Sequence, residues 1–398
     1  MNRIFWITAL IAFINSLSFT ILIPIIYLYG KQFGLNDFQT SLLFSTYSIA
    51  QFFATPVIGK LSDRFGRKPL LIISLAGTVI ANTIAGTATT ATLLFFARFL
   101  DGITGGNASV AQAVISDVTS QKDRAQAFGI YGAAMGLAFV LGPATSLVAQ
   151  QISLGTAFLV SGAVAFIGML MTIFLLPETI QNKETIQNKS PKSTNIFDLG
   201  LDNLIKGFAM PGIGILLFIN FCTGTTFTMF TYAFQPYFIQ VLDQNNKSLT
   251  LLFLVFGTLG VVMQTWGVSI LRRKFNVVKI LFLGLFVRSL SFILMPVWPS
   301  ITYFVVVSIL FALFNALVQP MISTLISLNA QPQDQGTVLG LNASYLSISS
   351  GIGPVIAGMI VQQSQPITYS YPLYLAGVLT FLVLVLAIAT RKRYSTAI

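Results

Sequence analysis

An arginine and an aspartate inside an apolar stretch are the residues of this sequence best placed to do chemistry. Arg98 and Asp101 lie three residues apart, so on a helix their side chains share one face. A charged side chain at the centre of a membrane costs about 2.5–3.5 kcal/mol on insertion scales, and it normally faces the interior of the protein. Two interpretations stay open: Asp101 takes up and releases a proton while Arg98 adjusts its proton affinity, or the two residues form a permanent ion pair that braces the helices.

The composition indicates that most of the chain lies in lipid. Of 398 residues, 55% are hydrophobic and 8% are charged, which leaves too little polar surface for a water-soluble domain. A helix needs about 20 apolar residues to cross roughly 30 Å of hydrocarbon. We therefore predict an all-α membrane protein of twelve transmembrane helices, over residues 5–29, 38–59, 70–88, 92–117, 126–150, 154–176, 208–240, 248–271, 278–297, 300–326, 336–361 and 370–390. The first span is too long for a signal-peptide core and is expected to stay in the mature protein.

The net charge of +11 at pH 7 follows a topological pattern. Lys31 and Lys247 are the basic residues of the predicted external loops, and Arg98 and Arg288 lie within spans. All the other lysines and arginines fall on the opposite side when the N-terminus is placed in the cytoplasm, as expected because cytoplasmic loops carry an excess of basic residues. We predict that both termini are cytoplasmic, expect the plasma (inner) membrane as the location, and exclude nucleic acid as a partner.

Several kinds of chemistry are excluded by residue types that are missing. The sequence has no histidine, and Cys222 is its single cysteine, so neither a histidine metal site nor an internal disulfide can form. No nucleophile with a base, metal cluster or phosphate-binding loop occurs at mechanistic spacing. We therefore expect a protein that is not an enzyme, needs no cofactor or metal, and is not driven by an ATPase of its own.

The chain is predicted to consist of two related six-helix halves. Residues 177–206 form the longest polar stretch and contain a near-duplication of the sequence ETIQNK, as expected of a cytoplasmic linker. We predict an N-terminal bundle over 1–176 and a C-terminal bundle over 207–398. One chain then contains a complete pathway and is expected to work as a monomer. Four residues of the first half recur in the second half at a constant distance along the sequence. They are Asp123, Gly129, Gly142 and Pro143, which correspond to Asp334, Gly340, Gly353 and Pro354.

The segment between the second and third predicted spans, Gly59 to Pro69, reads GKLSDRFGRKP. This pattern and its cytoplasmic position resemble the signature loop of the major facilitator superfamily. The resemblance implies that Gly59 allows close approach to the span over 336–361 and that Asp63 meets the positive end of that helix, where a carboxylate gains on the order of 0.3–1 kcal/mol. Fixing the topology is the alternative role of these charges. The predicted conformational latch comprises Gly59, Asp63, Gly66, Arg67, Lys68 and Asp117, in which Arg67 is expected to pair with Asp117.

The fifth predicted span contains small residues that allow close helix packing and a proline that can bend the helix: Gly132, Gly136, Gly142 and Pro143. Packing alone would account for them. The stretch from Arg98 to Pro143 is, however, similar to the drug/proton antiporters, and in particular to the twelve-helix tetracycline exporters, in which this glycine-proline element is regarded as a mark of antiporters. The similarity is good over most of the N-terminal half and weaker over the C-terminal half.

This sequence departs from the tetracycline exporters at their membrane-embedded aspartates. The corresponding places hold Asn15, Asn82 and, approximately, Arg288, and Thr145-Ser146 replaces a glycine pair. Amides can bind a solute through hydrogen bonds but cannot carry a proton. Tetracycline is therefore not the expected substrate. If transport is coupled to protons, Asp101 is the remaining candidate for carrying the proton.

Polar side chains within the spans are the candidates for lining a substrate cavity, although such groups also join helices through hydrogen bonds. The candidates are Asn15, Asn82, Asn107, Gln112, Tyr131, Tyr232, Gln235, Arg288, Asn315, Gln319 and Asn342.

Two six-helix repeats with a solute site near the midplane of the bilayer are typical of one class of secondary transporters. We favour a proton-coupled exporter of small lipophilic or amphipathic compounds that works by alternating access between rocking halves. The alternative is a transporter of a specific polar metabolite, by symport or facilitated diffusion. A receptor that has kept the fold is a third interpretation, which the short linker and tail disfavour.

Overall fold

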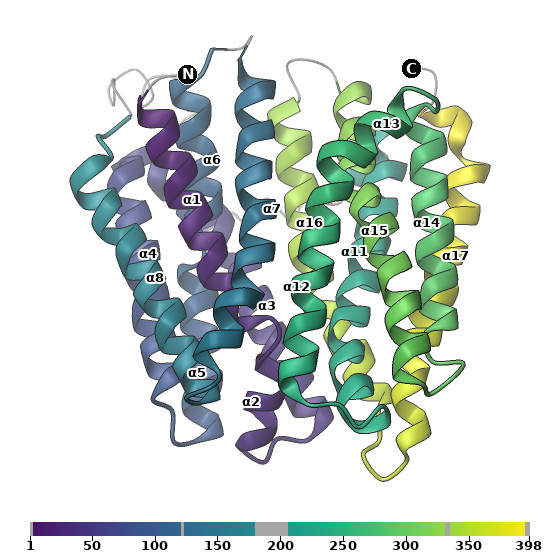
Figure 1. The fold of residues 1–398 in the computed structure, drawn as a ribbon. Coiled ribbons are helices and arrows are strands. Elements are labelled where there is room, and N and C mark those ends of the chain that lie inside the picture. Colours follow the sequence, from purple (N-terminus) through teal and green to yellow (C-terminus); the bar gives the residue numbers. More distant parts are fainter. Residues whose placement is uncertain (1–2, 121–122, 180–205, 331–334, 395–398) are drawn as a thin grey trace. The chain divides into compact units, whose positions relative to one another are not determined.

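The computed structural model describes residues 3–120, 123–179, 206–330 and 335–394. Within these ranges the regular secondary structure is helical throughout, with no strand (Figure 1). Eleven of the described helices are long and apolar enough to cross a membrane. The first half of the chain contains α1 (Arg3–Leu22), α2 (Ile26–Gln32), α3 (Asp37–Phe65), α4 (Arg67–Gly86), α5 (Ala91–Thr104), α6 (Asn107–Val118), α7 (Arg124–Ala149) and α8 (Leu154–Leu175).

The second half carries the remaining spans, two of which include a short π-helical segment. Its helices are α11 (Ile213–Pro236) continued by η1 (Tyr237–Val241), α12 (Asn246–Val262) continued by η2 (Met263–Gly267) and α13 (Val268–Arg272), α14 (Val277–Leu294), α15 (Ile301–Asn329), α16 (Gln335–Ile360), η3 (Pro366–Ser370), α17 (Tyr371–Ala389) and η4 (Arg391–Arg393).

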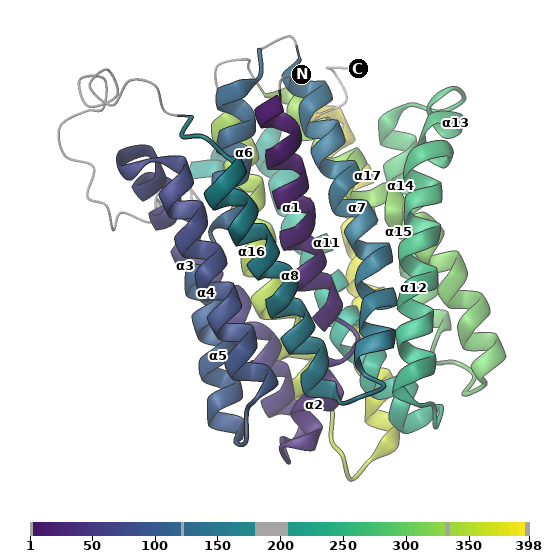
Figure 2. The same ribbon diagram turned by 60° about the vertical axis from the view of Figure 1, so that its left-hand side comes forward.

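The fourth predicted span is present but broken into two helices. It ends as α5 at Thr104 and resumes as α6 at Asn107, and Figure 2 shows α5 in the lower and α6 in the upper part of the view. The break falls on Gly105 and Gly106, because each glycine inside a helix is less favourable than alanine by about 1 kcal/mol. Neither helix alone is long enough to cross a membrane, which explains why eleven long helices correspond to twelve spans. The predicted twelve-helix fold is confirmed.

The first predicted span, 5–29, is also interrupted. The chain leaves the helix after Leu22 and enters α2 at Ile26, with Pro24 in the turn between them. Proline has no N–H to donate and its ring clashes with the preceding helical turn, so the helix ends there.

The surface of the described helices is apolar to a degree that suits lipid. Large hydrophobic side chains such as Phe174, Trp266 and Leu382 are more than half exposed. Water-soluble proteins rarely expose apolar patches on this scale, whereas lipid-facing helices must. The chain is therefore a multi-span integral membrane protein.

By its contacts the chain divides into two compact units. The first comprises residues 1–29 and 46–200, in which α1 packs against α7 and α8, and α4 packs against α8. The second comprises residues 30–45 and 201–398, in which α11 packs against α16, and α14 packs against α15 and α17.

Residues 30–45, although early in the chain, pack with the second unit. Ser45 Oγ donates to the Gly351 carbonyl at 2.6 Å, and Ser41 lies against Gly358, where a Cβ would come within 2.5 Å of the serine Cβ. The predicted boundary at 177–206 stays a prediction, because residues 180–205 lie outside the described residues.

Candidate functional site

Arg98 and Asp101 form a buried ion pair within the first unit. Their side chains lie on one face of α5, with 3.3 Å between Arg98 Nη1 and Asp101 Oδ2, and the residues are 4% and 6% exposed. Asp101 is also hydrogen-bonded to Thr78 of α4, and the Arg98 guanidinium lies 4.5 Å from the ring centre of Tyr47 of α3. The pair that the sequence singled out is therefore held by three helices.

Tyr47 and Gln51 connect this ion pair to the break in the fourth span. Gln51 Nε2 hydrogen-bonds to the Tyr47 hydroxyl at 3.0 Å and to the Gly105 carbonyl at 2.9 Å. Gln51 thus satisfies a backbone carbonyl at the point where the helix is interrupted. Neither residue was predicted from the sequence, although both are polar side chains one helical turn apart within an apolar span.

In the first unit, four of the five predicted cavity residues join neighbouring helices in pairs. Asn107 Nδ2 donates to Asn15 Oδ1, which connects α6 with α1, and Gln112 is hydrogen-bonded to Tyr131, which connects α6 with α7. Asn82 is buried on α4, facing Gly162 of α8. Through these residues α6 is therefore hydrogen-bonded to both α1 and α7.

In the second unit, three amides form one network. Asn220 Nδ2 donates to Asn342 Oδ1, and Gln319 Nε2 donates to Asn220 Oδ1 at 2.9 Å, so that α11, α16 and α15 are joined. Asn315 lies on α15 one turn before Gln319 and is partly buried. The structure therefore brings two of the predicted residues, Gln319 and Asn342, together around the buried Asn220.

Tyr232 lies in a different place from this network, against the early segment 30–45. Its hydroxyl donates to the Asp37 carbonyl oxygen, while the Tyr369 hydroxyl donates to Asp37 Oδ2 at 3.1 Å. Asp37 is 2% exposed and forms an ion pair with Lys31 at 2.9 Å. Asp37 was not predicted from the sequence, because it stands at the start of a span, where an acidic residue needs no special explanation. Gln235 is buried one turn after Tyr232, where its amide donates to the Thr231 carbonyl.

Arg288, on α14, is 2% exposed and contacts α11. Its Nη2 atom donates to the Thr223 carbonyl and to Thr226 Oγ1, the latter at 2.9 Å. The rings of Phe227 and Phe292 lie 5.6 and 5.3 Å from the guanidinium carbon.

The loop between α3 and α4 is tied to the ends of two other helices of the first unit. Arg67 pairs with Asp63 and, at 3.1 Å, with Asp117 at the end of α6. Glu178, beyond α8, accepts from the backbone N–H groups of Arg67 at 3.0 Å and Lys68 at 3.2 Å, which places a carboxylate at the positive N-terminus of α4. The sequence assigned Glu178 to the linker and missed this role. The expected contacts of Gly59 and Asp63 with the span over 336–361 stay predictions.

Gly66 has a backbone conformation that requires glycine. Its φ of 115° with ψ of 150° lies in a region that other residues reach at a cost of order 1–3 kcal/mol, and a Cβ would come within 2.4 Å of Glu178 Oε2. We expect Gly66→Ala to lower the thermal unfolding midpoint of the purified protein. Gly129→Ala on α7 is the matched control, because a Cβ there meets no described atom within 4 Å. Equal midpoints for both variants would contradict the assignment.

The residues of the fifth predicted span lie on α7, where packing accounts for one of them. A Cβ at Gly142 would come within 2.6 Å of Thr20 Cβ on α1, and Thr20 Oγ1 donates to the Ala138 carbonyl at 2.7 Å. Pro143 lies inside the helix directly after this contact. At Gly132, in contrast, a Cβ meets no described atom within 4 Å, so close packing within the described residues does not explain that glycine.

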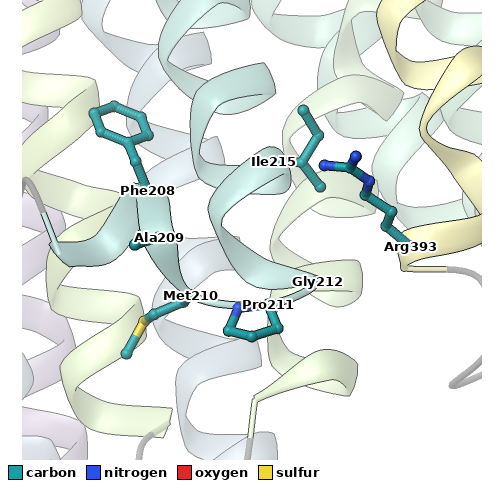
Figure 3. A pocket seen from close by; sticks show the side chains of 7 residues that line it. All are labelled: Phe208, Ala209, Met210, Pro211, Gly212, Ile215 and Arg393. Carbon is teal, nitrogen blue, oxygen red and sulfur yellow. The ribbon is translucent and has the colours of Figure 1, made fainter.

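A hollow of about 420 Å³ lies where α11 begins (Figure 3). Phe208, Ala209, Met210, Pro211, Gly212, Ile215 and Arg393 line it, and Figure 3 shows the Arg393 guanidinium reaching toward Ile215. It contains none of the residues predicted to line a cavity.

Comparison with known proteins gives one consistent result. The sequence profile of the Major Facilitator Superfamily matches residues 8–273 and 216–397. The chain is 23% identical over 402 residues to the tetracycline resistance protein, class H, of Pasteurella multocida, covering 100% of this chain and 98% of that protein. It is 24% identical over 387 residues to multidrug resistance protein 2 of Bacillus subtilis (strain 168), covering 97% and 94%.

A solved structure agrees in fold. The crystal structure of the human organic anion transporter MFSD10 (TETRAN) superposes with a TM-score of 0.74 at 20% identity, covering 97% of this chain and 99% of that one. At this identity the likeness shows the fold alone. Because the superfamily profile matches nearly the whole length of the sequence and the twelve spans agree with it, this chain belongs to the Major Facilitator Superfamily of membrane transporters.

Proposed function

We propose that this protein exports small lipophilic or amphipathic compounds across the plasma (inner) membrane in exchange for protons, by alternating access. The observation that carries the proposal is the buried Arg98–Asp101 pair, because an ionisable pair inside a span is costly and typically marks an ion pathway. The relatives named for tetracycline and multidrug resistance support export over uptake.

The coupling step is a change in the charge of Asp101. When Asp101 takes up a proton, Arg98 loses its counter-charge while it remains buried beside Tyr47. A buried charge without its partner is strongly unfavourable, so the pair rearranges on protonation. Gln51 contacts both the Tyr47 hydroxyl and the Gly105 carbonyl, and through these bonds the rearrangement reaches the break between α5 and α6.

The loop from Gly59 to Pro69 acts as the cytoplasmic latch of this cycle. Arg67 is held by Asp63 and Asp117, so that Asp63 is positioned at the end of α3. Asp63 meets the start of α16 when the cytoplasmic side is closed and leaves it when the halves rock apart. Both termini lie in the cytoplasm, a single chain is sufficient for transport, and the halves are joined through 177–206.

Transport of a polar metabolite is the second candidate. The network of Asn220, Gln319 and Asn342 favours it, because converging amides could bind a polar solute. Each of these hydrogen bonds already joins two helices, however, which is the pattern of amides that hold a membrane bundle together.

Proteoliposomes with an imposed pH gradient and an internal pH indicator test the proposal. We expect at least one compound from a panel of lipophilic cations, anions and neutral drugs to dissipate the gradient faster than in protein-free liposomes. Radiolabelled sugars and nucleosides form the second panel. Equilibration of a polar solute, with no compound moving protons, would show that the protein is a metabolite transporter instead.

A further inference from the structure

The second half of the chain carries an arginine inside the membrane that has no acidic counterpart there. Asp243 and Asp334 are the acidic residues beyond Asp202 in the sequence, and neither lies within a described membrane-spanning helix. Asp37, which packs with this unit, already pairs with Lys31. Arg288 therefore differs from Arg98, whose charge Asp101 balances.

The contacts of Arg288 leave it with an unused donor. Its Nη2 atom donates to Thr223 and Thr226, whereas its Nε atom is buried and has no hydrogen-bond partner among the described residues. A guanidinium has five N–H donors in a planar fork, which matches the two oxygens of a carboxylate or sulfonate. The threonine oxygens and the rings of Phe227 and Phe292 offset part of the cost of burying this cation, and an anion would satisfy the remaining donor.

Thr226 connects Arg288 to a pocket of about 240 Å³ between α11 and α17. Thr226 accepts the hydrogen bond from Arg288 and also lines the pocket, together with apolar side chains that include Phe218, Phe221 and Leu382. An apolar cavity of about 150 Å³ binds benzene, so this pocket has room for an aromatic ring with a substituent. The pocket therefore offers an almost wholly apolar wall, and Thr226 stands between it and the buried Arg288 guanidinium.

The depth of this site restricts the anion. Thr226 lies on α11 roughly 20 Å from Ile213 and roughly 15 Å from Pro236 at 1.5 Å per residue. This is near the middle of a hydrocarbon layer about 30 Å thick, which the phosphate groups of bilayer lipids do not reach. A small amphipathic anion can bring its charged group into the hydrocarbon layer, because Arg288 offers that group an ion-pair partner there.

We propose that Arg288 and the α11–α17 pocket bind a lipophilic organic monoanion, with its aryl group in the pocket and its carboxylate or sulfonate on the guanidinium. This inference rests on the proposed function, and it assigns the exporter a substrate class that includes amphipathic anions. Arg288 replaces a bond to Thr226 or uses its free Nε atom to receive the anion.

Binding of 2-naphthoate to the purified full-length protein tests this site, with 2-naphthamide as the uncharged counterpart. We expect 2-naphthoate to bind and 2-naphthamide to bind at least about tenfold more weakly, because a charge-assisted hydrogen bond is lost. Arg288→Gln should weaken 2-naphthoate about 10- to 100-fold, and Arg288→Lys should weaken it less. No change in either variant, or no binding to the wild type, overturns the proposal.

A second pair of variants leaves Arg288 in place, in case its replacement impairs folding. Leu382→Trp adds bulk to the wall of the pocket, whereas Phe381→Trp introduces the same side chain at an exposed neighbouring position that does not line it. Only Leu382→Trp should weaken 2-naphthoate; equal affinities for both would contradict the assignment. Binding is measured without a pH gradient, so Arg288-dependent binding with no proton movement would refute the exporter and leave the anion site intact.

Discussion

Asp101→Asn is expected to reduce substrate-driven proton movement in proteoliposomes to the rate of protein-free liposomes. Asparagine has nearly the shape of aspartate and can keep a hydrogen bond to Thr78, but it cannot bind and release a proton. The other acidic residues of the first half lie in loops or at the ends of predicted spans, so none of them can replace Asp101 as a proton carrier inside the membrane. The measurement is dissipation of an imposed pH gradient after addition of a compound that the wild type transports.

Asp243→Asn is the matched control for this prediction. It makes the same chemical change at an exposed residue before α12, and coupling should be unaffected. Substrate binding by the Asp101 variant should persist, which separates loss of coupling from loss of folding. Normal proton movement through Asp101→Asn would mean that the Arg98–Asp101 pair only braces α5, and that protons, if coupled, use another route.

Asp37→Asn is expected to destabilise the protein by on the order of 3 kcal/mol, seen as a lower thermal unfolding midpoint in detergent. Asp37 is almost fully buried and pairs with Lys31, whose side chain is 17% exposed. Without the carboxylate, the lysine keeps its charge and little water to solvate it, and the Tyr369 hydroxyl loses a charged acceptor. The residues around this pair attach 30–45 to the second unit, so proteolysis in this segment should also become faster.

The double variant Lys31→Gln/Asp37→Asn distinguishes the ion pair from packing. Removing both charges leaves no buried charge without a partner, so the double variant should be more stable than Asp37→Asn alone. Asp63→Asn is the comparison for an exposed pair, because the Asp63 side chain is 53% exposed and its loss should cost no more than about 1 kcal/mol. An Asp37→Asn protein as stable as the wild type would show that the early segment is held by its serine and tyrosine contacts instead.

The sequence by itself determined the number of spans, the helical class and the family of this protein. In lipid every backbone N–H and C=O must be paired within the segment, so a run of about 20 apolar residues is sufficient to predict a helix. The breaks at Pro24 and at Gly105 and Gly106 were likewise readable from residue type, although the predicted spans ran through them. The ion pair of Arg98 with Asp101 followed from spacing, because residues three apart on a helix are neighbours.

Only the tertiary structure decided which distant residues share a site. Tyr232 was grouped with the cavity residues, but its hydroxyl bonds to Asp37. Tyr369 also contacts Asp37, although these two residues are 332 positions apart in the sequence. Glu178, which the sequence placed in a linker, lies at the start of α4, and Arg288 donates to Thr223 and Thr226 of α11. Hydropathy and spacing describe one helix at a time, whereas these contacts depend on how the side chains of several helices fill the space between them.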